Sequence, residues 1–460
     1  MIMYETSTLK EKLKLFSYLL LPILITQVSM YLMNFFDTVM SGRAGATDLA
    51  GVAIGASLWT PIFTGVNGII LAITPIIAQL TGAKATKDIS KKILQGIYLA
   101  IGLAIIVIII GSLLLNPILN FMDLEIEVRH TAKYYLVALG AGIVPLFIFN
   151  TLRSFIDALG KTRMSMVIIL IALPINIVLN YVFIFGKLGI PAYGGIGSGI
   201  ATAITYWIVC AISVVIIYKI HPFQGYRVFS TWYRPSIVDW WEQLKIGLPI
   251  GFAIFFETSI FSAVTLFMSV YSTYTIASHQ AAINFASLLY MIPLSVGIAL
   301  TIAIGFEVGA KRFDHARIYG SIGMGSGLFI AVFAAVILYV FDDFVAGLYS
   351  NNPDVIELTK KFIYFAIFYQ LADAFGAPIQ GALRGYKDVN ITLIIALVSY
   401  WIIGLPTGWL LANYTALEPF GYWVGLIIGL ASGAIALLFR LFYVQKKVAE
   451  QKNIAQIINN

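Results

Sequence analysis

Long apolar segments separated by short polar ones are the feature that most constrains this chain. A helix of about 20 apolar residues is long enough to cross the hydrocarbon core of a bilayer. Twelve such segments can be delimited, at 15–41, 51–80, 93–117, 131–158, 164–186, 194–219, 243–270, 276–309, 318–341, 356–384, 389–412 and 420–444. Because 60% of the 460 residues are hydrophobic and only 11% are charged, a soluble core could not bury them. We expect an all-α integral membrane protein with twelve transmembrane helices.

Lysine and arginine are distributed unevenly between the two sides of these spans. Only six of the 29 lie in the odd-numbered loops, namely Arg43, Arg129, Lys133, Lys187, Lys360 and Lys361. Basic residues accumulate on the cytoplasmic side of membrane proteins. We therefore expect a multi-pass protein of the cell (inner, cytoplasmic) membrane with both termini in the cytoplasm. The net charge of +7 follows from this topology and gives no reason to expect nucleic acid as a partner.

The chain also repeats itself at a constant offset of 227 residues. The matches are Leu21-Pro22-Ile23 with Leu248-Pro249-Ile250, Leu49-Ala50 with Ile276-Ala277, Thr74 with Thr301, and Gly82-Ala83-Lys84 with Gly309-Ala310-Lys311. Because six spans separate the copies, both halves insert in the same orientation. We predict two six-helix lobes related by internal pseudo-twofold symmetry, with the ligand path between them. The predicted limits are an amino-terminal lobe at 1–218, an interfacial linker at 219–245, a carboxyl-terminal lobe at 246–445 and a cytoplasmic tail at 446–460.

The predicted linker mixes aromatic and basic residues. Its aromatic residues are Trp232, Tyr233, Trp240 and Trp241, and its basic ones include Arg227, Arg234 and Lys245. Such a segment lies along the cytoplasmic membrane interface, where both residue types are enriched. We favour plain anchoring over the alternative of a regulatory or lipid-recognition site.

A carboxylate in the first apolar segment is the first candidate for a functional group. Near the bilayer centre a charged side chain such as that of Asp37 costs roughly 2.5–3.5 kcal/mol on insertion scales. Gln27, Tyr31, Asn34 and Thr38 are spaced so that they share one helical face, with Asp37 at its edge. This polar stripe predicts a water-lined interior and a titrating role for Asp37. The alternative is an acid at a helix end that reaches headgroup water.

Two further acids lie inside apolar segments of the second half. Glu257 follows Pro249 in the motif FFETS, and Asp373 ends the motif YQLAD. Tyr369 and Asp373 are four residues apart, so the phenol and the carboxylate share a helical face. Buried acids on different helices rarely occur without converging on a partner. They predict a proton or sodium site, with Na⁺ held at Glu257 and Asp373. The alternative is that the two acids share a proton as structural glue.

The first half offers a matching set of oxygen and amide groups. Asn176 and Asn180 lie one turn apart in the fifth span, and Thr202 lies in the sixth. Hard cations such as sodium prefer oxygen ligands, which Asp37 and these three residues can supply together. Interhelical hydrogen bonding by the two asparagines is an equally good interpretation.

The remaining ionisable residues give no indication of a transport role. Arg153 with Asp157, and Glu307 with Lys311, are neighbours one turn apart at helix ends, so we expect ion pairs and not transport groups. His279 opens the eighth span and is expected to face water, because no partner with metal-ligand spacing is visible.

Catalytic motifs are absent from the sequence. The single cysteine, Cys210, excludes a disulfide framework and a cysteine-based metal site. No phosphate-binding loop, nucleotide motif or Ser/His/Asp arrangement is found, so ATP-driven transport and hydrolysis have no support. We expect a protein that is not an enzyme and has no cofactor, with Na⁺ or H⁺ as a coupling ion.

Several segments together resemble the multidrug and toxic compound extrusion (MATE) family, NorM-type branch. They are NFFDTVMSG at 34–42, TPIIAQLTGA at 74–83, FFETS at 255–259, HQAAINFASLLYMIPLSVGIA at 279–299, YQLAD at 369–373 and IQGALRGYKD at 379–388. The resemblance covers almost the whole chain, and the six segments taken together are specific.

The resemblance implies a V-shaped pair of lobes around a central cavity, which exports organic cations in exchange for Na⁺ or H⁺ and confers drug resistance. It also implies a cation site at Glu257, Tyr369 and Asp373 and an essential Asp37. Archaeal-type relatives are similar at Asn176 but carry an acid where this chain has Asn180. An amino-terminal cation site here would therefore have one carboxylate fewer.

Alternative functions remain open at this point. A lipid-linked oligosaccharide flippase of the same superfamily would also have many helices, but its anionic substrate would require Arg or Lys in the cavity, whereas the embedded charges here are acids. Isolated acids on separate helices also make a poor channel filter. The expected partners are organic cation drugs and the lipid bilayer, and we expect a monomer with no obligate protein partner.

Overall fold

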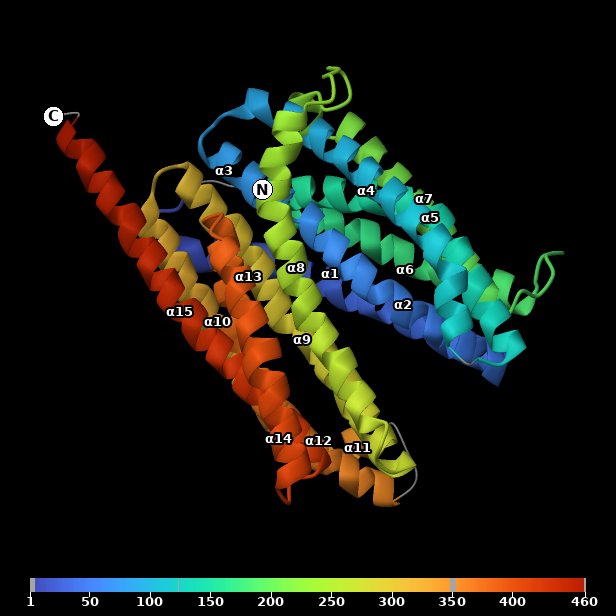
Figure 1. Cartoon of the computed structure of the whole chain (residues 1–460). Coiled ribbons are helices and arrows are strands. Elements are labelled where there is room, and N and C mark those ends of the chain that lie inside the picture. Colours follow the sequence, from blue (N-terminus) through green and yellow to red (C-terminus); the bar gives the residue numbers. More distant parts are fainter. Residues whose placement is uncertain (1–4, 123, 348–352, 459–460) are drawn as a thin grey trace. The chain divides into compact units, whose positions relative to one another are not determined.

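The structure is a computed structural model that describes residues 5–122, 124–347 and 353–458 (Figure 1). Within these ranges the chain forms helices and loops and contains no β-strand. Twelve helical segments of the described chain are long and apolar enough to cross a membrane. The expectation of an all-α membrane protein with twelve spanning helices is therefore confirmed.

The first half of the chain forms α1 Leu9–Ala44, α2 Ala46–Ile70, α3 Ile73–Gly82, α4 Thr86–Phe121, α5 Ile126–Ala158, α6 Thr162–Phe185 and α7 Gly195–Lys219. A short 3-10 helix, η1 Phe223–Tyr226, follows. The second half forms α8 Ile237–Met268, α9 Thr273–Gly309, α10 Phe313–Val340, α11 Asp342–Gly347, α12 Pro353–Gly385, α13 Asn390–Leu397, the π-helical η2 Val398–Gly404, α14 Leu405–Tyr414 and α15 Pro419–Ile458. The predicted tail thus continues α15 as far as residue 458, and its last two residues lie outside the described chain.

The described chain divides into two compact units. The first is Ile25–Gly251, and the second contains the described residues up to Leu24 together with those from Phe252 onward. Both borders lie two residues after a proline inside a continuous helix, Pro22 in α1 and Pro249 in α8. The predicted lobe limits lie instead in polar segments. They differ because a polar segment marks where a chain leaves the membrane, whereas a unit border marks where its packing partners change.

The internal repeat is visible in the bounds of the helices. The span formed by α2 and α3 begins at Ala46 and α9 begins at Thr273, which are 227 residues apart. The two ends of α5 are displaced from the two ends of α12 by the same interval. The short sequence matches therefore belong to a repeat of complete helices.

A helix cap is repeated as well. Lys84 follows α3 and Lys311 follows α9, and both have φ of 58°, in the left-handed region where many helices end. The N–H of Ala85 donates to the carbonyl of Leu80 at 3.0 Å, and the equivalent bond in the second half measures 2.9 Å. Both are the long-range bond of a Schellman motif. The repeated Gly-Ala-Lys sequence thus terminates equivalent helices.

The helices α5 and α12 are the central helices of their units. In Figure 1, α5 lies beside α4 and α7, and it also packs against α2; α12 packs against α9, α10 and α15. Surrounded in this way, both helices bury charged side chains, Arg153 and Asp157 on α5 and Asp373 and Arg384 on α12. These two helices therefore position most of the chemistry described below.

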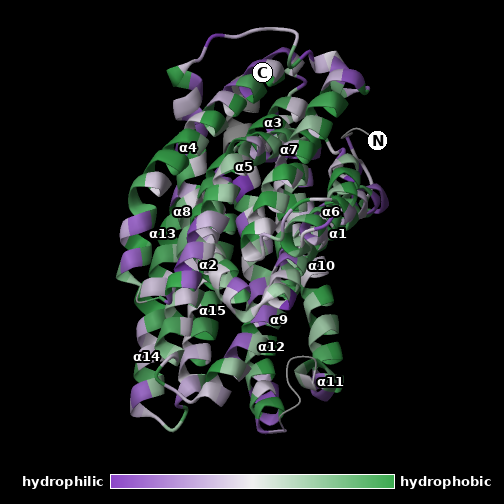
Figure 2. Cartoon of the chain, turned by 90° about the vertical axis from the view of Figure 1, so that its right-hand side faces the viewer, coloured by the Kyte–Doolittle hydropathy of each residue, from purple (hydrophilic) through white to green (hydrophobic). Residues whose placement is uncertain are grey.

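The outer helices expose apolar side chains. The helix α4 exposes a run of large aliphatic residues, Ile105, Ile106, Ile109, Ile110, Leu113 and Leu114. In Figure 2 hydrophobic residues cover most of the helical ribbon, while loops and helix ends hold many of the hydrophilic ones. Such a surface is stable against lipid tails and would not be stable in water.

The helix α8 begins at Ile237, inside the segment predicted as a linker at 219–245. Ser236 starts the helix because its Oγ accepts the backbone N–H of Asp239 at 3.3 Å, as an N-cap does. The Asp239 carboxylate in turn accepts from Nζ of Lys92 on α4 at 2.7 Å. The later part of the predicted linker is therefore a helix fixed to the first unit.

Helices α9 and α12 approach each other closely at Gly297 and Gly381. A Cβ atom at position 381 would lie 2.1 Å from the carbonyl oxygen of Gly297, and one at position 297 would lie 2.7 Å from that of Ala377. Small residues allow membrane helices to pack backbone against backbone in this way. This crossing holds α12, which carries Tyr369 and Asp373, against α9.

We expect Gly381→Ala to destabilise the protein, because the added methyl group would overlap backbone atoms of α9, which cannot rotate away. Over-packing typically costs about 1–3 kcal/mol. The measurement is the Tm of purified protein in detergent. Gly376→Ala on the same helix is the control, since the nearest atom to a Cβ there lies 3.9 Å away. Equal Tm values for both variants would contradict the close approach.

Candidate functional site

Three helices of the first unit bring polar side chains together around Asp37. The helix α1 supplies Asp37, α6 supplies Asn176 and Asn180, and α7 supplies Thr202, and all four are buried. Nδ2 of Asn180 donates to Oδ1 of Asp37 at 2.5 Å, and Oγ1 of Thr202 donates to Oδ2 at 3.0 Å. Each carboxylate oxygen therefore has a partner from a different helix.

The amides of this cluster also bind one another. Nδ2 of Asn180 donates to Oδ1 of Asn176 at 3.1 Å, and Nδ2 of Asn176 donates to Oγ1 of Thr202 at 3.4 Å. The Oδ1 atom of Asn180 is buried without a hydrogen-bond partner in the described chain. Such an oxygen beside a carboxylate fits a cation or a proton-bearing group. The interhelical hydrogen bonds of the alternative interpretation are present, because Asn180 binds Asp37 of α1 and Asn176 binds Thr202 of α7.

Asn34 does not join this cluster. Its Nδ2 donates to the backbone carbonyl of Met30 at 3.3 Å, and Asn34 is exposed. Thr38 likewise donates to the backbone carbonyl of Asn34, at 3.0 Å. The face of α1 that carries Asn34 and Thr38 is therefore not the face through which Asp37 meets α6 and α7. Residue spacing defines a stripe on a helix but not the helix that faces it.

Two tyrosines near Asp37 are not found by the sequence argument. Tyr135 on α5 and Tyr206 on α7 both lie within electrostatic range of the carboxylate. Tyr135 fits against α2 at Gly55, where a Cβ atom would come within 2.4 Å of its ring. Tyr206 follows Thr202 by four residues and shares its face of α7, so helical spacing could have found it. No such signal exists for Tyr135.

The second unit holds a separate cluster around Glu257 and Asp373. Glu257 lies on α8, and Tyr369 and Asp373 lie one turn apart on α12, and all three are buried. Tyr290 of α9 donates its phenol O–H to Oε1 of Glu257 at 3.4 Å. Glu257 lies close enough to Asp373 for a direct electrostatic interaction. The three residues predicted to share a site are thus brought together from two helices.

Asp373 has no compensating hydrogen bond. Neither carboxylate oxygen has a partner among the described residues, although the residue is only 1% exposed. An ionised carboxylate in such surroundings is strongly unfavourable unless a cation lies beside it. The Asp373 carboxylate is therefore suited to binding either a proton or a metal cation. Either species would also relieve the electrostatic repulsion between Asp373 and Glu257.

A glutamine and an arginine extend this cluster along α12. Gln380 and Arg384 are both buried, and Nη2 of Arg384 donates to Oε1 of Gln380 at 3.2 Å. Gln380 is within hydrogen-bonding reach of Glu257, and Arg384 acts on it electrostatically. They follow Asp373 by seven and eleven residues, on the same helical face. Helical spacing from Asp373 is therefore a sequence signal that could have found both residues.

Tyr400 approaches the same acids from η2, where the helix widens into π-helical turns before Pro406. Proline cannot donate to the carbonyl four residues earlier, which disturbs the helix locally. Turns of this type occur often at functional sites. The adjacent Trp401 donates its Nε1–H to the carbonyl of Phe256 at 3.1 Å, next to Glu257. Nothing in the local sequence pointed to Tyr400.

The ligand chemistry of both clusters is that of hard cations. No group of three or more His, Cys, Asp or Glu side chains is placed to hold a metal ion within the described ranges. The clusters instead combine one or two carboxylates with phenol, hydroxyl and amide oxygens, which suit Na⁺. Cys210 packs in the apolar core of the first unit and takes no part.

The ion pairs predicted at helix ends form differently. Glu307 accepts from Nε and Nη2 of Arg312, both at 2.7 Å, and not from Lys311 as predicted. Lys311 cannot extend the helical spacing because it lies in the left-handed cap after α9. Arg153 donates to Sδ of Met30 at 2.9 Å and acts electrostatically on Asp157. Neither acid belongs to the two clusters.

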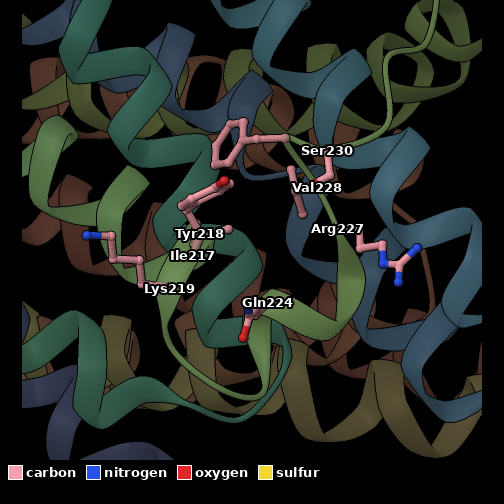
Figure 3. Close-up of a pocket in the computed structure, with 8 residues that line it drawn as sticks. Ile217, Tyr218, Lys219, Gln224, Arg227, Val228 and Ser230 are labelled. Atoms are coloured by element: carbon pink, nitrogen blue, oxygen red, sulfur yellow. The ribbon is translucent and has the colours of Figure 1, made fainter.

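A pocket of about 440 Å³ lies where α7 ends and the connection to α8 begins. Its lining includes Tyr218, Lys219, Gln224 and Arg227, and it contains none of the predicted site residues. Figure 3 shows the charged ends of Lys219 and Arg227 directed away from each other on opposite sides. The two cations therefore do not converge on one anion, which leaves membrane anchoring as the simpler interpretation of this segment.

Within the described ranges, twelve helices long and apolar enough to cross a membrane form two repeated sets, each with buried acids, and the sequence has no nucleotide motif. This is the architecture of a membrane transporter built from two repeated halves. The family model described as MatE matches residues 22–182 and 249–410. The chain therefore belongs to the MATE family, and its similarity to the proteins named below places it in the NorM-type branch.

Sequence and structure similarity to individual proteins support the assignment to the MATE family. The chain is 70% identical to a "Probable multidrug resistance protein NorM" of Oceanobacillus iheyensis, over 97% of this chain and 100% of the relative. It is 55% identical to a protein of the same description from Bacillus subtilis, over 98% and 100%. The crystal structure of the eukaryotic MATE transporter AtDTX14 matches with a TM-score of 0.85 and 22% identity, over 96% of this chain and 99% of that one. The last similarity concerns the fold alone.

Proposed function

We propose that the protein is a secondary active multidrug efflux antiporter, which exports organic cations in exchange for Na⁺, H⁺ or both by alternating access. The observation that carries the proposal is Asp373, whose two buried carboxylate oxygens have no hydrogen-bond partner among the described residues while Glu257 lies nearby. Such a pair is stable when a cation is bound and unstable when both acids are ionised and empty. Cation binding and release can therefore drive a change of conformation.

In this mechanism Glu257 and Asp373 hold the coupling cation, and the phenols of Tyr369 and Tyr290 supply further oxygens. Asp37 acts in the other unit, where Asn176, Asn180 and Thr202 surround it, and it links the exported drug to a proton or cation. Because 14% of the residues are aromatic, drug contacts by stacking and cation–π attraction would tolerate many substrates. We expect both termini to lie in the cytoplasm and the protein to act as a monomer without an obligate protein partner.

We expect Na⁺ to be the driving ion, with protons able to compete, since the cluster offers several oxygens where a proton carrier needs only one carboxylate. A second entering charge would gain roughly 2.3 kcal/mol per 100 mV of membrane potential. Exchange of one Na⁺ for one monovalent drug would draw nothing from the potential. Steep drug accumulation therefore favours more than one coupling charge in each cycle.

The test is efflux of a lipophilic cation such as ethidium from proteoliposomes. An imposed Na⁺ gradient at fixed pH is compared with an imposed pH gradient in Na⁺-free buffer. Protein-free liposomes measure the passive leak of ethidium. We expect the Na⁺ gradient to drive efflux and added protons to reduce it. If only the pH gradient drives efflux, and Na⁺ does not displace bound ethidium, the acids form a proton relay. Efflux under neither gradient would leave the flippase as the better hypothesis.

A further inference from the structure

His279 is buried in the core of the second unit and does not face water as the sequence predicted. It lies in the first turns of α9, and both ring nitrogens have a partner. Nε1 of Trp423, on α15, donates to its Nδ1 at 3.1 Å. Its Nε2 lies 3.2 Å from Oγ1 of Thr265, on α8. The imidazole therefore joins three helices of the unit.

These two contacts determine which ring nitrogen of His279 carries the proton. An indole N–H can only donate a hydrogen bond, so Nδ1 of His279 must be an unprotonated acceptor. In a neutral ring the proton then lies on Nε2, which donates to the hydroxyl of Thr265. A proton on Nδ1 would place two N–H groups against each other and leave the indole of Trp423 without an acceptor. The arrangement thus selects one neutral tautomer.

Trp423 connects this imidazole to the candidate cation site. The Trp423 and Tyr369 rings meet edge to face, with centroids 6.5 Å apart and an angle of 84°. On its other side Tyr369 meets Phe261 of α8, with centroids 5.5 Å apart at 80°. Two edge-to-face contacts therefore hold the Tyr369 ring one helical turn from Asp373. Trp423 is itself fully buried, and its one polar atom is the group bound to His279.

We infer that His279 is a positioning residue for the coupling-cation site: its Nδ1 fixes Trp423, which holds the Tyr369 phenol in place beside Asp373. The inference rests on the proposed function, because it assigns Tyr369 to the cation site. His279 does not touch the cation in this arrangement and keeps a single neutral form. It acts by fixing the indole nitrogen of Trp423, and this hydrogen bond restricts rotation about the side-chain bonds more tightly than packing alone.

The tautomer can be measured on the unmodified protein. The chain contains only four histidines, so ¹⁵N-histidine labelling gives a resolvable set of imidazole signals. At neutral pH we expect one histidine with an unprotonated Nδ1 and a protonated Nε2, assigned by its loss in His279→Asn. Trp423→Phe should shift this signal, since it removes the donor but keeps an aromatic ring. A doubly protonated ring or the opposite tautomer would overturn the inference.

The functional test compares two amide replacements. An asparagine oxygen can take the place of Nδ1 and accept from Trp423, whereas a glutamine amide reaches only the place of Nε2. We expect His279→Gln to raise the half-saturating concentration of the coupling cation about tenfold, since it leaves a buried donor unpaired. His279→Asn should stay within about threefold of the wild type. The maximal rate of efflux should change little in both variants. If His279 only stabilised the fold, His279→Gln would lower the maximal rate instead.

Glu257→Gln, measured in the same proteoliposomes, separates the positioning role of His279 from the antiport proposal. If it strongly reduces the ion response while His279→Gln and His279→Asn both leave the half-saturating concentration unchanged, the positioning role is wrong and the antiport proposal stands. If Glu257→Gln leaves the ion response unchanged, the proposed site is wrong and the role of His279 is overturned with it. The double variant Trp423→Phe with His279→Gln should be no worse than Trp423→Phe alone, because that change has already removed the hydrogen bond to His279.

Discussion

Replacement of Asp37 by asparagine is expected to reduce drug efflux to the background level while leaving the protein inserted and folded. Asparagine has almost the same size and keeps one oxygen to accept from Asn180 or Thr202, which now hold the carboxylate at 2.5 Å and 3.0 Å. Loss of one hydrogen bond costs only about 0.5–1.5 kcal/mol of stability. The amide cannot, however, bind and release a proton or neutralise a cation.

The measurement is drug efflux from energised membrane vesicles, normalised to the amount of protein in the membrane. Asp48→Asn is the matched control, because Asp48 also belongs to the first unit and accepts the N–H of Gly195 at 2.6 Å. An asparagine oxygen can accept that bond equally well, so this variant should transport normally. Efflux at the wild-type rate by well-inserted Asp37→Asn protein would rule out a titrating role for this carboxylate.

Glu257→Gln and Asp373→Asn are each expected to slow ion-driven efflux strongly while leaving a measurable rate, and the double variant should be little worse than either. Two acids that act on one bound cation titrate as a unit, so removing the second after the first removes nothing further. Residues in independent sites would instead show losses that multiply. The structure favours the first outcome because Asp373 has no hydrogen-bond partner in the described chain and Glu257 is its electrostatic neighbour.

The rates are measured under the Na⁺ gradient and the pH gradient separately, with all variants reconstituted at equal density. Asp388→Asn is the control, since Asp388 forms a partly exposed ion pair with Arg440 at 2.6 Å in the same unit. Such pairs contribute about 0–1 kcal/mol, so its loss should be tolerated. Multiplicative losses in the double variant would show that Glu257 and Asp373 belong to separate sites.

The membrane class, the helical composition and the repeat follow from the order of residues along the chain. A run of about 20 apolar residues has one stable structure in a bilayer, because each backbone N–H and C=O must be paired within the segment. The constant spacing between Leu21-Pro22-Ile23 and Leu248-Pro249-Ile250 likewise needs no structure to be seen. Helical spacing also placed Tyr369 with Asp373 and Asn176 with Asn180, because neighbours one turn apart share a face.

Contacts between helices could be decided only by the tertiary structure. The side of α1 that meets α6 and α7 sets Asp37 against Asn180 and leaves Asn34 outside, and spacing along α1 is the same in either case. Tyr135, Tyr290 and Tyr400 reach the acids from other helices, with no signal in their own segments. His279 is buried because α8 and α15 cover it, although its place at a helix start suggested water. Periodicity along one helix determines which residues share a face, whereas packing determines what that face meets.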